Sequence, residues 1–229
     1  MKVMFISDVH LGSKGSRSDE LLETLKKENP QKLFIVGDFI DGWLLQKRWW
    51  WRQRETNVIR KILSLTKKGC EVVWITGNHD DFMREWTPFE FGDNLKVVDE
   101  WEWNGYYITH GDLYDGVVKL KWLGKLGSIG YETAIGIDIL LRKWGWKTSL
   151  SKWLKQKVKR AVKFINSFER QLAYQAKIRG CKGVICGHIH QPCDKKIKVQ
   201  GDTIHYLNCG DWIEHNSYII WEKTFKLYK

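Results

Sequence analysis

The segment Gly183-Val184-Ile185-Cys186-Gly187-His188-Ile189-His190 decides how the rest of this 229-residue chain is interpreted. Its first four residues are typical of a short buried strand, and Gly187 allows the chain to turn where that strand ends. One residue separates the two histidines, so in an extended chain both imidazoles point to the same side. Paired imidazoles at a strand end favour a metal site, although an isolated His-x-His is more often two surface histidines. The interpretation therefore depends on whether other ligands occur elsewhere.

Other side chains that can bind metals follow further predicted strands. Apolar, strand-like runs cover residues 2–7, 33–36, 71–75 and 106–109. The polar residues at their ends are Asp8, His10, Asp38, Asn78 and His110. Because functional residues of α/β proteins gather at the carboxyl ends of the strands, we expect these residues to meet His188 and His190.

The seven side chains are more than one ion needs, and they suit two ions that share one carboxylate. Mixed oxygen and imidazole ligands without a thiolate favour manganese, iron, cobalt or zinc over calcium, and manganese is our first choice. We assign the first metal to Asp8, His10, Asp38 and His190, and the second metal to Asp38, Asn78, His110 and His188.

Two such ions about 3.5–4 Å apart are expected to bind a phosphoryl oxygen and to generate hydroxide for in-line attack on phosphorus. His79 is adjacent to Asn78, and we predict that it gives a proton to the leaving group. Asp41 follows Asp38 by three residues and is predicted to hold His79 in the required tautomer. We also expect Asn78, His79 and His188 to contact the substrate.

Charge is distributed unevenly along the chain. Residues 114–180 contain 15 basic and 4 acidic residues, a net charge of +11, whereas the remainder has 23 of each. A basic insertion in a neutral scaffold is expected to attract nucleic acid, phosphorylated ligands or an anionic membrane surface. The five cysteines form no Cys-x-x-Cys pattern, and there is no signal peptide or run of 18 apolar residues, so we expect a cytoplasmic protein with reduced thiols.

The second half of this insertion has the pattern of an amphipathic helix. Apolar residues recur every three or four positions from Leu150 to Leu172, and lysines occupy the opposite face. We expect the apolar face to line a groove; that acyl chains occupy it is what the resemblance described below implies. Lys155 and Lys159, one helical turn apart, are the candidates for binding substrate phosphate. The alternative is that the apolar face packs on the core and that the lysines are solvated.

Strands and helices alternate over the first 80 residues, which predicts an α/β fold. We expect one long helix from about Leu44 to Lys68, and shorter antiparallel strands from Leu95 onward. The predicted core comprises residues 1–113 and 181–229, and residues 114–180 form an inserted helical lid.

Together the motifs resemble those of the calcineurin-like metallophosphoesterase superfamily. The resemblance implies a two-sheet β-sandwich flanked by helices (α/β/β/α), a dinuclear metal centre and hydrolysis of phosphoesters. It implies the metal roles given above, with His79 as proton donor and Asp41 as its partner. The motifs are Asp8-x-His10, Gly37-Asp38-x-x-Asp41, Gly77-Asn78-His79-Asp80, His110-Gly111-Asp112 and Gly187-His188-x-His190.

A closer resemblance is to the UDP-2,3-diacylglucosamine hydrolases of lipid A synthesis and their broader bacterial relatives. It is carried by residues 6–12, residues 109–115, the helical insertion and the ending Asn208-Cys209-Gly210-Asp211-Trp212-Ile213-Glu214. It implies a pyrophosphatase that hydrolyses a nucleotide-lipid diphosphate, with a lid that holds the acyl chains. Such an enzyme is expected on the cytoplasmic face of the inner membrane. His79 stands where the best-known hydrolases carry arginine.

The sequence leaves three hypotheses about function. The first is the nucleotide-lipid pyrophosphatase. The second is a phosphodiesterase, nuclease or general metallophosphatase acting on another phosphoester, which the basic insertion leaves open. The third, a metal-binding module without catalysis, is disfavoured because Asp41 and His79 have no role as ligands.

Overall fold

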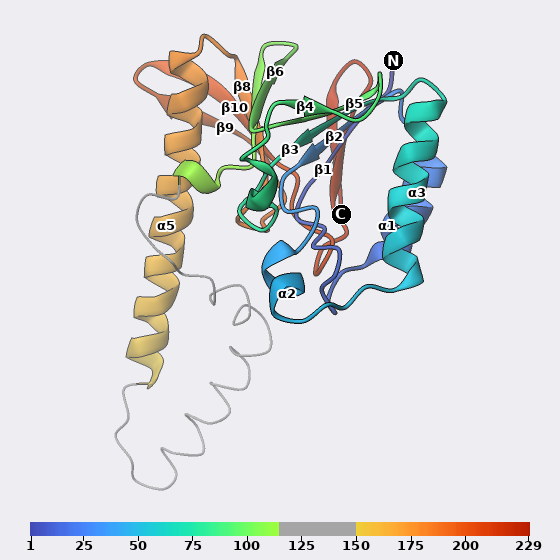
Figure 1. Ribbon diagram of the computed structural model, residues 1–229. Coiled ribbons are helices and arrows are strands. Elements are labelled where there is room, and N and C mark those ends of the chain that lie inside the picture. Colours follow the sequence, from blue (N-terminus) through green and yellow to red (C-terminus); the bar gives the residue numbers. More distant parts are fainter. Residues whose placement is uncertain (115–149) are drawn as a thin grey trace, which may run out of the picture. The chain divides into compact units, whose positions relative to one another are not determined.

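Figure 1 shows the computed structural model of the protein, which describes residues 1–114 and 150–229, without the side chains of residues 150–161. The chain divides into two compact units, Met1–Tyr114 with Leu172–Lys229, and Asp115–Gln171. The first unit contains both β-sheets and every predicted metal ligand.

Two mixed β-sheets are present among the described residues. The larger sheet has seven strands in the order β12-β11-β1-β2-β3-β5-β4, and the smaller has five in the order β6-β7-β8-β10-β9. The larger comprises β1 (Val3–Ile6), β2 (Lys32–Val36), β3 (Glu71–Ile75), β4 (Phe89–Glu90), β5 (Leu95–Val98), β11 (Tyr218–Trp221) and β12 (Phe225–Tyr228). The smaller comprises β6 (Glu100–Trp103), β7 (Tyr106–Thr109), β8 (Gly183–Cys186), β9 (Cys193–Val199) and β10 (Asp202–Asn208).

Strand direction brings the functional loops together. The central strands β1, β2, β3 and β5 are parallel, and so are β7, β8 and β10 in the smaller sheet. Parallel strands end at the same edge of their sheet, so the loops that follow β1, β2 and β3 lie next to one another.

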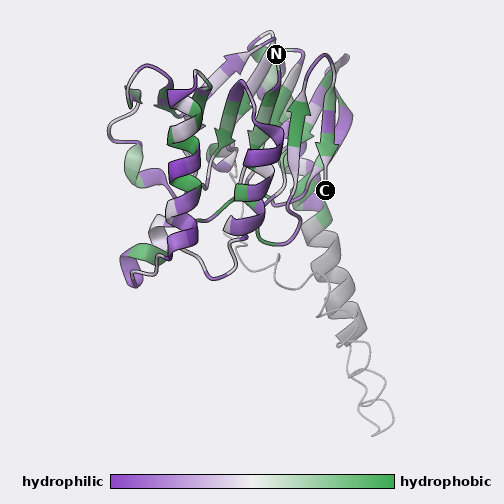
Figure 2. Ribbon diagram, turned by 90° about the vertical axis from the view of Figure 1, so that its right-hand side faces the viewer, coloured by the Kyte–Doolittle hydropathy of each residue, from purple (hydrophilic) through white to green (hydrophobic). Residues whose placement is uncertain are grey.

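Two hydrophobic layers hold the sandwich together. Because side chains along a strand alternate between its faces, Phe5, Phe34 and Val73 face the smaller sheet and pack with Ile108 and Ile185. The alternate residues pack against the helices α1 (Ser18–Glu28) and α3 (Gln53–Lys67), which lie side by side over the outer face of the larger sheet (Figure 1). Figure 2 shows the strands as the most hydrophobic segments, whereas hydrophilic residues cover much of the helix surface. The predicted α/β fold of two stacked sheets with flanking helices is confirmed.

The amphipathic helix predicted in the insertion is α5 (Leu150–Ile178). Within the first unit, Leu172 and Ala176 at its end are fully buried. The Arg179 guanidinium lies 4.2 Å from the ring centroid of Tyr107 in β7. The Lys177 ammonium donates to the carbonyl oxygen of Gln200 at 2.9 Å. The end of the insertion is thus fixed to the smaller sheet. None of the helices in residues 1–114 and 150–229 combines the length and apolarity needed to span a bilayer.

The structure corrects two expectations about secondary structure. The predicted long helix is two helices, α2 (Gly42–Lys47) and α3, because Arg48 is extended and Trp51 instead packs against the core. The antiparallel pairing expected of the strands from Leu95 onward holds for β6 with β7 and for β5 with the short β4. However, β5 lies parallel to β3, with Leu95 opposite Val72. Apolar alternation indicates that a strand exists but not the direction in which it pairs.

Candidate metal centre

The predicted ligands follow the carboxyl ends of β1, β2, β3, β7 and β8 and converge on one site. Five of them have positive φ angles between 51° and 70°, namely Asp8, His10, Asp38, His188 and His190. This left-handed conformation is uncommon for residues with a Cβ, and strained backbone of this kind concentrates at functional sites.

Motif glycines provide the space in which these side chains meet. A Cβ at Gly37 would overlap the ring of His110, and one at Gly77 would overlap the Asp38 carboxylate. A Cβ at Gly187 would overlap the Ser7 hydroxyl and the Asp8 carboxylate. Each glycine therefore allows a backbone segment to approach a ligand closely.

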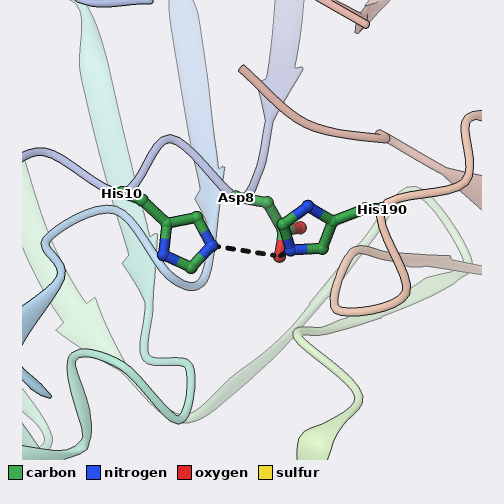
Figure 3. Close-up of side chains that lie close together, drawn as sticks. All are labelled: Asp8, His10 and His190. Carbon is green, nitrogen blue, oxygen red and sulfur yellow. Dashed lines mark ion pairs between the residues drawn. The ribbon is translucent and has the colours of Figure 1, made fainter. Parts of the chain in front are cut away.

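The first group of ligands is drawn in Figure 3, where His10 and His190 lie on either side of Asp8. His190 Nε2 is 3.1 Å and His10 Nε2 is 3.9 Å from Asp8 Oδ1. The two imidazole rings are 5.3 Å apart, centroid to centroid. One ion between these three side chains is within reach of each of them.

Asp38 belongs to two of the three groups of side chains that can each hold an ion. Its Oδ2 is 3.3 Å from His110 Nε2 and 3.8 Å from His10 Nε2. The ring of His188 is 5.2 Å from that of His110. The structure gives three overlapping groups that can each hold an ion: Asp8, His10 and His190; His10, Asp38 and His79; and Asp8, Asp38 and His110. Asp38 is thus placed between the sets of side chains assigned to the two metals.

Buried polar atoms without partners provide a test of whether these residues suit a metal. Asp8 Oδ1, His10 Nε2, Asn78 Oδ1 and His110 Nε2 are buried and form no hydrogen bond with any described residue, although His190 Nε2 and Asp38 Oδ2 lie within ion-pair distance of the first and the last of them. Leaving such groups unpaired is costly, and native proteins satisfy nearly all of them. All four are predicted ligand atoms, and an oxygen and imidazole set of this kind suits divalent transition metals. The residues therefore fit a dinuclear centre.

Neighbouring groups fix the orientation of the ligands. Ser7 Oγ and the His188 backbone N–H lie 2.6 and 3.0 Å from Asp8 Oδ2. The His79 backbone N–H donates to Asp38 Oδ1 at 2.7 Å. His110 Nδ1 lies 2.9 Å from the carbonyl oxygen of Val36, which directs Nε2 toward Asp38. Such outer contacts orient metal ligands and select their tautomers.

The predicted pair of His79 and Asp41 forms a direct contact. His79 Nδ1 lies 2.8 Å from Asp41 Oδ1, so Nε2 faces Asp38 at 4.0 Å. Asp41 also has a partner that the sequence did not indicate, because its Oδ2 lies 3.4 Å from His10 Nδ1. The ring of Trp43 packs against His79, with 4.3 Å between their centroids.

The carboxylates and imidazoles of the site shift one another's pKa values. Burial favours the neutral form of Asp8, but His190 outweighs it and lowers the pKa of Asp8 to about 2. Burial disfavours a charged imidazole, yet Asp38 raises the pKa of His110 to about 10 and Asp8 raises that of His190 to about 9. Burial and the Asp41 contacts with His10 and His79 have opposite effects, and the net pKa of Asp41 is lowered.

Three further residues support the site, and the sequence did not assign them a role. Asp80 Oδ2 accepts from the Phe39 N–H at 2.9 Å and from Trp74 Nε1 at 3.1 Å, which positions the loop around Asp38. Burial, together with Asp38, raises the pKa of Asp80 to about 6. In the sequence, the one indication of a role for Asp80 was its position directly after Asn78 and His79.

Asp211 and His215 lie behind His190. Asp211 Oδ2 is 3.7 Å from His190 Nδ1 and 2.7 Å from His215 Nδ1. Asp211 Oδ1 also accepts from the backbone N–H of Glu214 at 2.6 Å, and the side chain is fully buried. An aspartate and a histidine four residues apart near the end of the chain were visible in the sequence, but their distance from the other motifs gave no reason to place them here.

The two lysine predictions fall outside what the structure describes. Lys155 and Lys159 are in the first turns of α5, and their side chains are not among the described ones. The division of the ligands between two metals also stays a prediction.

The chain is similar to several known proteins. Residues 1–192 match the family described as calcineurin-like phosphoesterase. A UDP-2,3-diacylglucosamine hydrolase from Porphyromonas gingivalis is 24% identical, over 97% of this chain and 95% of its own length. A protein of the same name from Neisseria gonorrhoeae is 25% identical, over 93% and 90%. Among solved structures, the phosphoesterase Yfce from E. coli is 15% identical, with a TM-score of 0.46 over 97% of this chain and 89% of its own.

Proposed function

The chain belongs to the calcineurin-like phosphoesterase family, and we propose that it hydrolyses UDP-2,3-diacylglucosamine or a related nucleotide-lipid diphosphate. The family and the hydrolase-named relatives support a hydrolase of phosphoester or phosphoanhydride bonds. The proposed substrate is drawn from the names of those relatives, which match this chain over most of its length.

The observation that carries the proposal is the set of buried, unpartnered ligand atoms around Asp38. Within the part of the chain that the structure describes, Asp8 Oδ1, His10 Nε2, Asn78 Oδ1 and His110 Nε2 form no hydrogen bond. Asp38 lies between them, within 3.3 Å of His110 and 3.8 Å of His10. A buried site built in this way gains stability when cations satisfy its ligands.

We propose which metal ion each predicted ligand binds. We assign one ion to Asp8, His10, Asp38 and His190, and the other to Asp38, Asn78, His110 and His188. We propose manganese for both, with iron, zinc or cobalt as alternatives. When bound, two such ions act as Lewis acids and stabilise the negative charge that develops on the phosphoryl group.

The chain itself supplies proton transfer and orientation. Asp41 accepts from Nδ1 of His79 at 2.8 Å, which leaves Nε2 directed toward the site. His79 Nε2 is the proposed donor to the leaving oxygen. His79 also stands where the best-known lipid hydrolases carry arginine, so substrate recognition at this position differs from theirs. Asn78, His79 and His188 are the proposed contacts to the phosphoryl group.

The basic insertion is the proposed lid for a lipid substrate. Its net charge of +11 suits a diphosphate and an anionic membrane surface. Lys155 and Lys159 are the proposed phosphate contacts. On this basis we place the enzyme peripherally on the cytoplasmic face of the inner membrane. Nucleic acid is the less favoured partner because the lysines share their helix with a continuous apolar stripe.

The function is tested with the manganese-loaded protein and purified UDP-2,3-diacylglucosamine. We expect release of UMP and the acylated sugar phosphate, and we expect Asp38→Ala to reduce the rate by at least about a thousandfold. A matched Asp194→Ala variant, altered outside the site, should keep the rate. Turnover of a chromogenic phosphodiester without turnover of the nucleotide lipid would favour the alternative of a phosphodiesterase acting on another substrate. Unchanged turnover by Asp38→Ala would contradict the dinuclear mechanism.

A further inference from the structure

A cluster of tryptophans and cations lies in the chain immediately after the candidate site. Residues 42–54 contain four tryptophans, three arginines and a lysine, and no acidic residue. We call residues 44–52 the tryptophan segment. It covers most of α2 and the connection to α3, which runs along the lower edge of the first unit in Figure 1.

The tryptophan segment exposes large apolar side chains to solvent. Trp49 is 73% exposed and Leu44 is 44% exposed. Exposed aromatic and aliphatic side chains next to cations are typical of surfaces that enter the membrane–water interface. Isolated exposed apolar residues are common, so the argument depends on how these are held and on what surrounds them.

One tryptophan anchors the segment to the core. Trp51 packs against the hydrophobic layer beneath α1 and α3, and its Nε1 donates to Thr56 Oγ1 at 3.0 Å. Trp49 stacks against Trp51, with ring centroids 6.1 Å apart and an angle of 24° between the rings. The contact with Trp51 therefore holds the Trp49 side chain in an exposed position, so Trp49 loses little conformational freedom when a partner binds.

Two of the four cations are available to a partner. Arg52 and Arg54 both contact the Glu55 carboxylate, at 2.7 and 3.0 Å. Lys47 and Arg48 are exposed, and neither forms an ion pair with any residue that the structure describes. No acidic residue occurs between positions 42 and 54 that could neutralise Lys47 and Arg48. Their positive charge can therefore attract an anionic partner.

The position of the segment links it to the reacting groups. Asp41 caps the start of α2 by accepting from the Leu44 N–H at 3.0 Å. Trp43, one residue before the segment, packs against His79. A partner bound to the tryptophan segment would therefore be linked through the start of α2 to Asp41 and His79.

We propose that the tryptophan segment docks the protein on an anionic lipid surface. A lipid is favoured over nucleic acid because Trp49, Trp50 and Trp51 each already have one ring face engaged. Arg52 lies over the ring of Trp50 at 3.8 Å, and Trp49 and Trp51 face each other. Stacking of bases requires free ring faces, whereas insertion into an interface does not. Leu44 adds an aliphatic contact that lipid accepts. The choice of a lipid also rests on the proposed function.

The experiment measures partition of the full, metal-loaded chain onto vesicles without substrate. Vesicles of phosphatidylcholine are compared with vesicles that contain about one third phosphatidylglycerol. The test variants are Trp49→Ser and the double variant Lys47→Glu with Arg48→Glu. We expect each to lower partition onto anionic vesicles at least about tenfold.

Matched controls change similar residues at the opposite edge of the larger sheet. Phe91→Ser removes an aromatic side chain that is 59% exposed next to the start of β5. Lys67→Glu with Lys68→Glu reverses two adjacent charges at the end of α3, as the test variant does at the end of α2. These controls should change partition by less than about twofold, because they leave both the tryptophan segment and the basic insertion of residues 114–180 unchanged.

Three outcomes decide the proposal. A loss restricted to the segment variants supports it. Equal partition of the test and control variants overturns it. It is also overturned if the segment variants lose binding to single-stranded polyuridylate and keep binding to vesicles. The measurement needs no turnover, so its failure is distinct from failure of the proposed reaction, which the nucleotide-lipid assay reports.

Discussion

At the scale of single residues, Asp41 connects two imidazoles of the candidate centre. Its two oxygens lie 2.8 Å from His79 Nδ1 and 3.4 Å from His10 Nδ1. One carboxylate therefore orients both the predicted proton donor and a predicted metal ligand. Removal of His79 affects only the first of these roles, whereas removal of Asp41 affects both.

His79→Ala tests the role of the proton donor. We expect kcat to fall by about 10²- to 10⁴-fold, because the leaving oxygen loses its donor. Metal content, measured by mass spectrometry, should stay at the wild-type value. His205→Ala is the matched control, since His205 pairs with Asp194 at 2.8 Å outside the site. Unchanged turnover of His79→Ala would remove the role assigned to this residue.

Asp211 should act on metal affinity through His190. In Asp211→Asn the carboxylate near His190 Nδ1 loses its charge, and we expect metal affinity to fall about 10- to 100-fold. The measurement is calorimetric titration of metal into the chelator-treated protein. Asp194→Asn removes a similar carboxylate–imidazole contact elsewhere and should leave the affinity unchanged. Equal affinities of the two variants would show that Asp211 serves only the local loop.

Raised histidine pKa values make metal binding depend on pH. The pKa of His110 is about 10 and that of His190 about 9, so both are protonated in the metal-free protein at neutral pH. In that form they stabilise the fold below pH 6.5, and this contribution is lost as the pH rises through about 9 to 10. Metal requires neutral imidazoles, so binding should release about two protons near pH 7.5.

The number of protons released is measured by calorimetry in buffers with different ionisation enthalpies. Asp8 is already ionised, since its pKa is about 2, and it contributes no proton. We expect the apparent affinity to increase from pH 6 to pH 8. Affinity that does not change over this range would mean that the histidines are neutral before metal binds.

At the scale of elements, the strand–loop junctions build the centre. The loops after β1, β2 and β8 all carry residues with positive φ, and each loop approaches another through a glycine. Gly187 is an informative case because its hydrogen points at Ser7 and Asp8, which follow β1 of the other sheet. The two sheets therefore meet at the site through a contact that has no space for a methyl group.

Gly187→Ala should damage the site more than a glycine change elsewhere. We expect a loss of about 2–3 kcal/mol in the free energy of unfolding, and reduced metal content because Asp8 is displaced. Gly201→Ala is the control: nothing lies within 4 Å of its added Cβ, although its φ of +91° makes the change unfavourable. It should cost about 1–2 kcal/mol and leave metal content intact. Normal metal content in Gly187→Ala would contradict this description of the junction.

At the scale of the whole first unit, the centre joins residues far apart in the sequence. The His188 backbone donates to Asp8 across 180 positions of sequence. Before metal binds, the buried carboxylates of Asp8 and Asp38 are held together by charged histidines. Metal ions that bind only this folded arrangement must stabilise it.

Removal of metal should therefore lower the melting temperature. At free metal 100 times above the dissociation constant, binding contributes about 2.7 kcal/mol. For a chain of this size the melting temperature should fall by about 5–10 °C when a chelator is added. Asp38→Ala is the control and should melt at the same temperature with and without metal. A wild-type protein insensitive to chelation would contradict a centre within the folded unit.

The sequence by itself determined most strands, the α/β class and the residues that meet at the site. Buried strands produce local apolar runs, and ligand chemistry restricts the residue types at their ends, so both signals are readable without coordinates. The sequence did not determine that β5 is parallel to β3, that the helix after Asp41 breaks at Arg48, or that Asp41 also contacts His10.

Those features were decided only by the tertiary structure, because they depend on which distant segment each one meets. Trp51 leaves the helical pattern to pack on the core, and the Asp211–His215 pair gains meaning only from its distance to His190. Pairing direction, packing and contacts across 180 residues are properties of the folded chain. A local pattern cannot record them, since the same pattern is compatible with several partners.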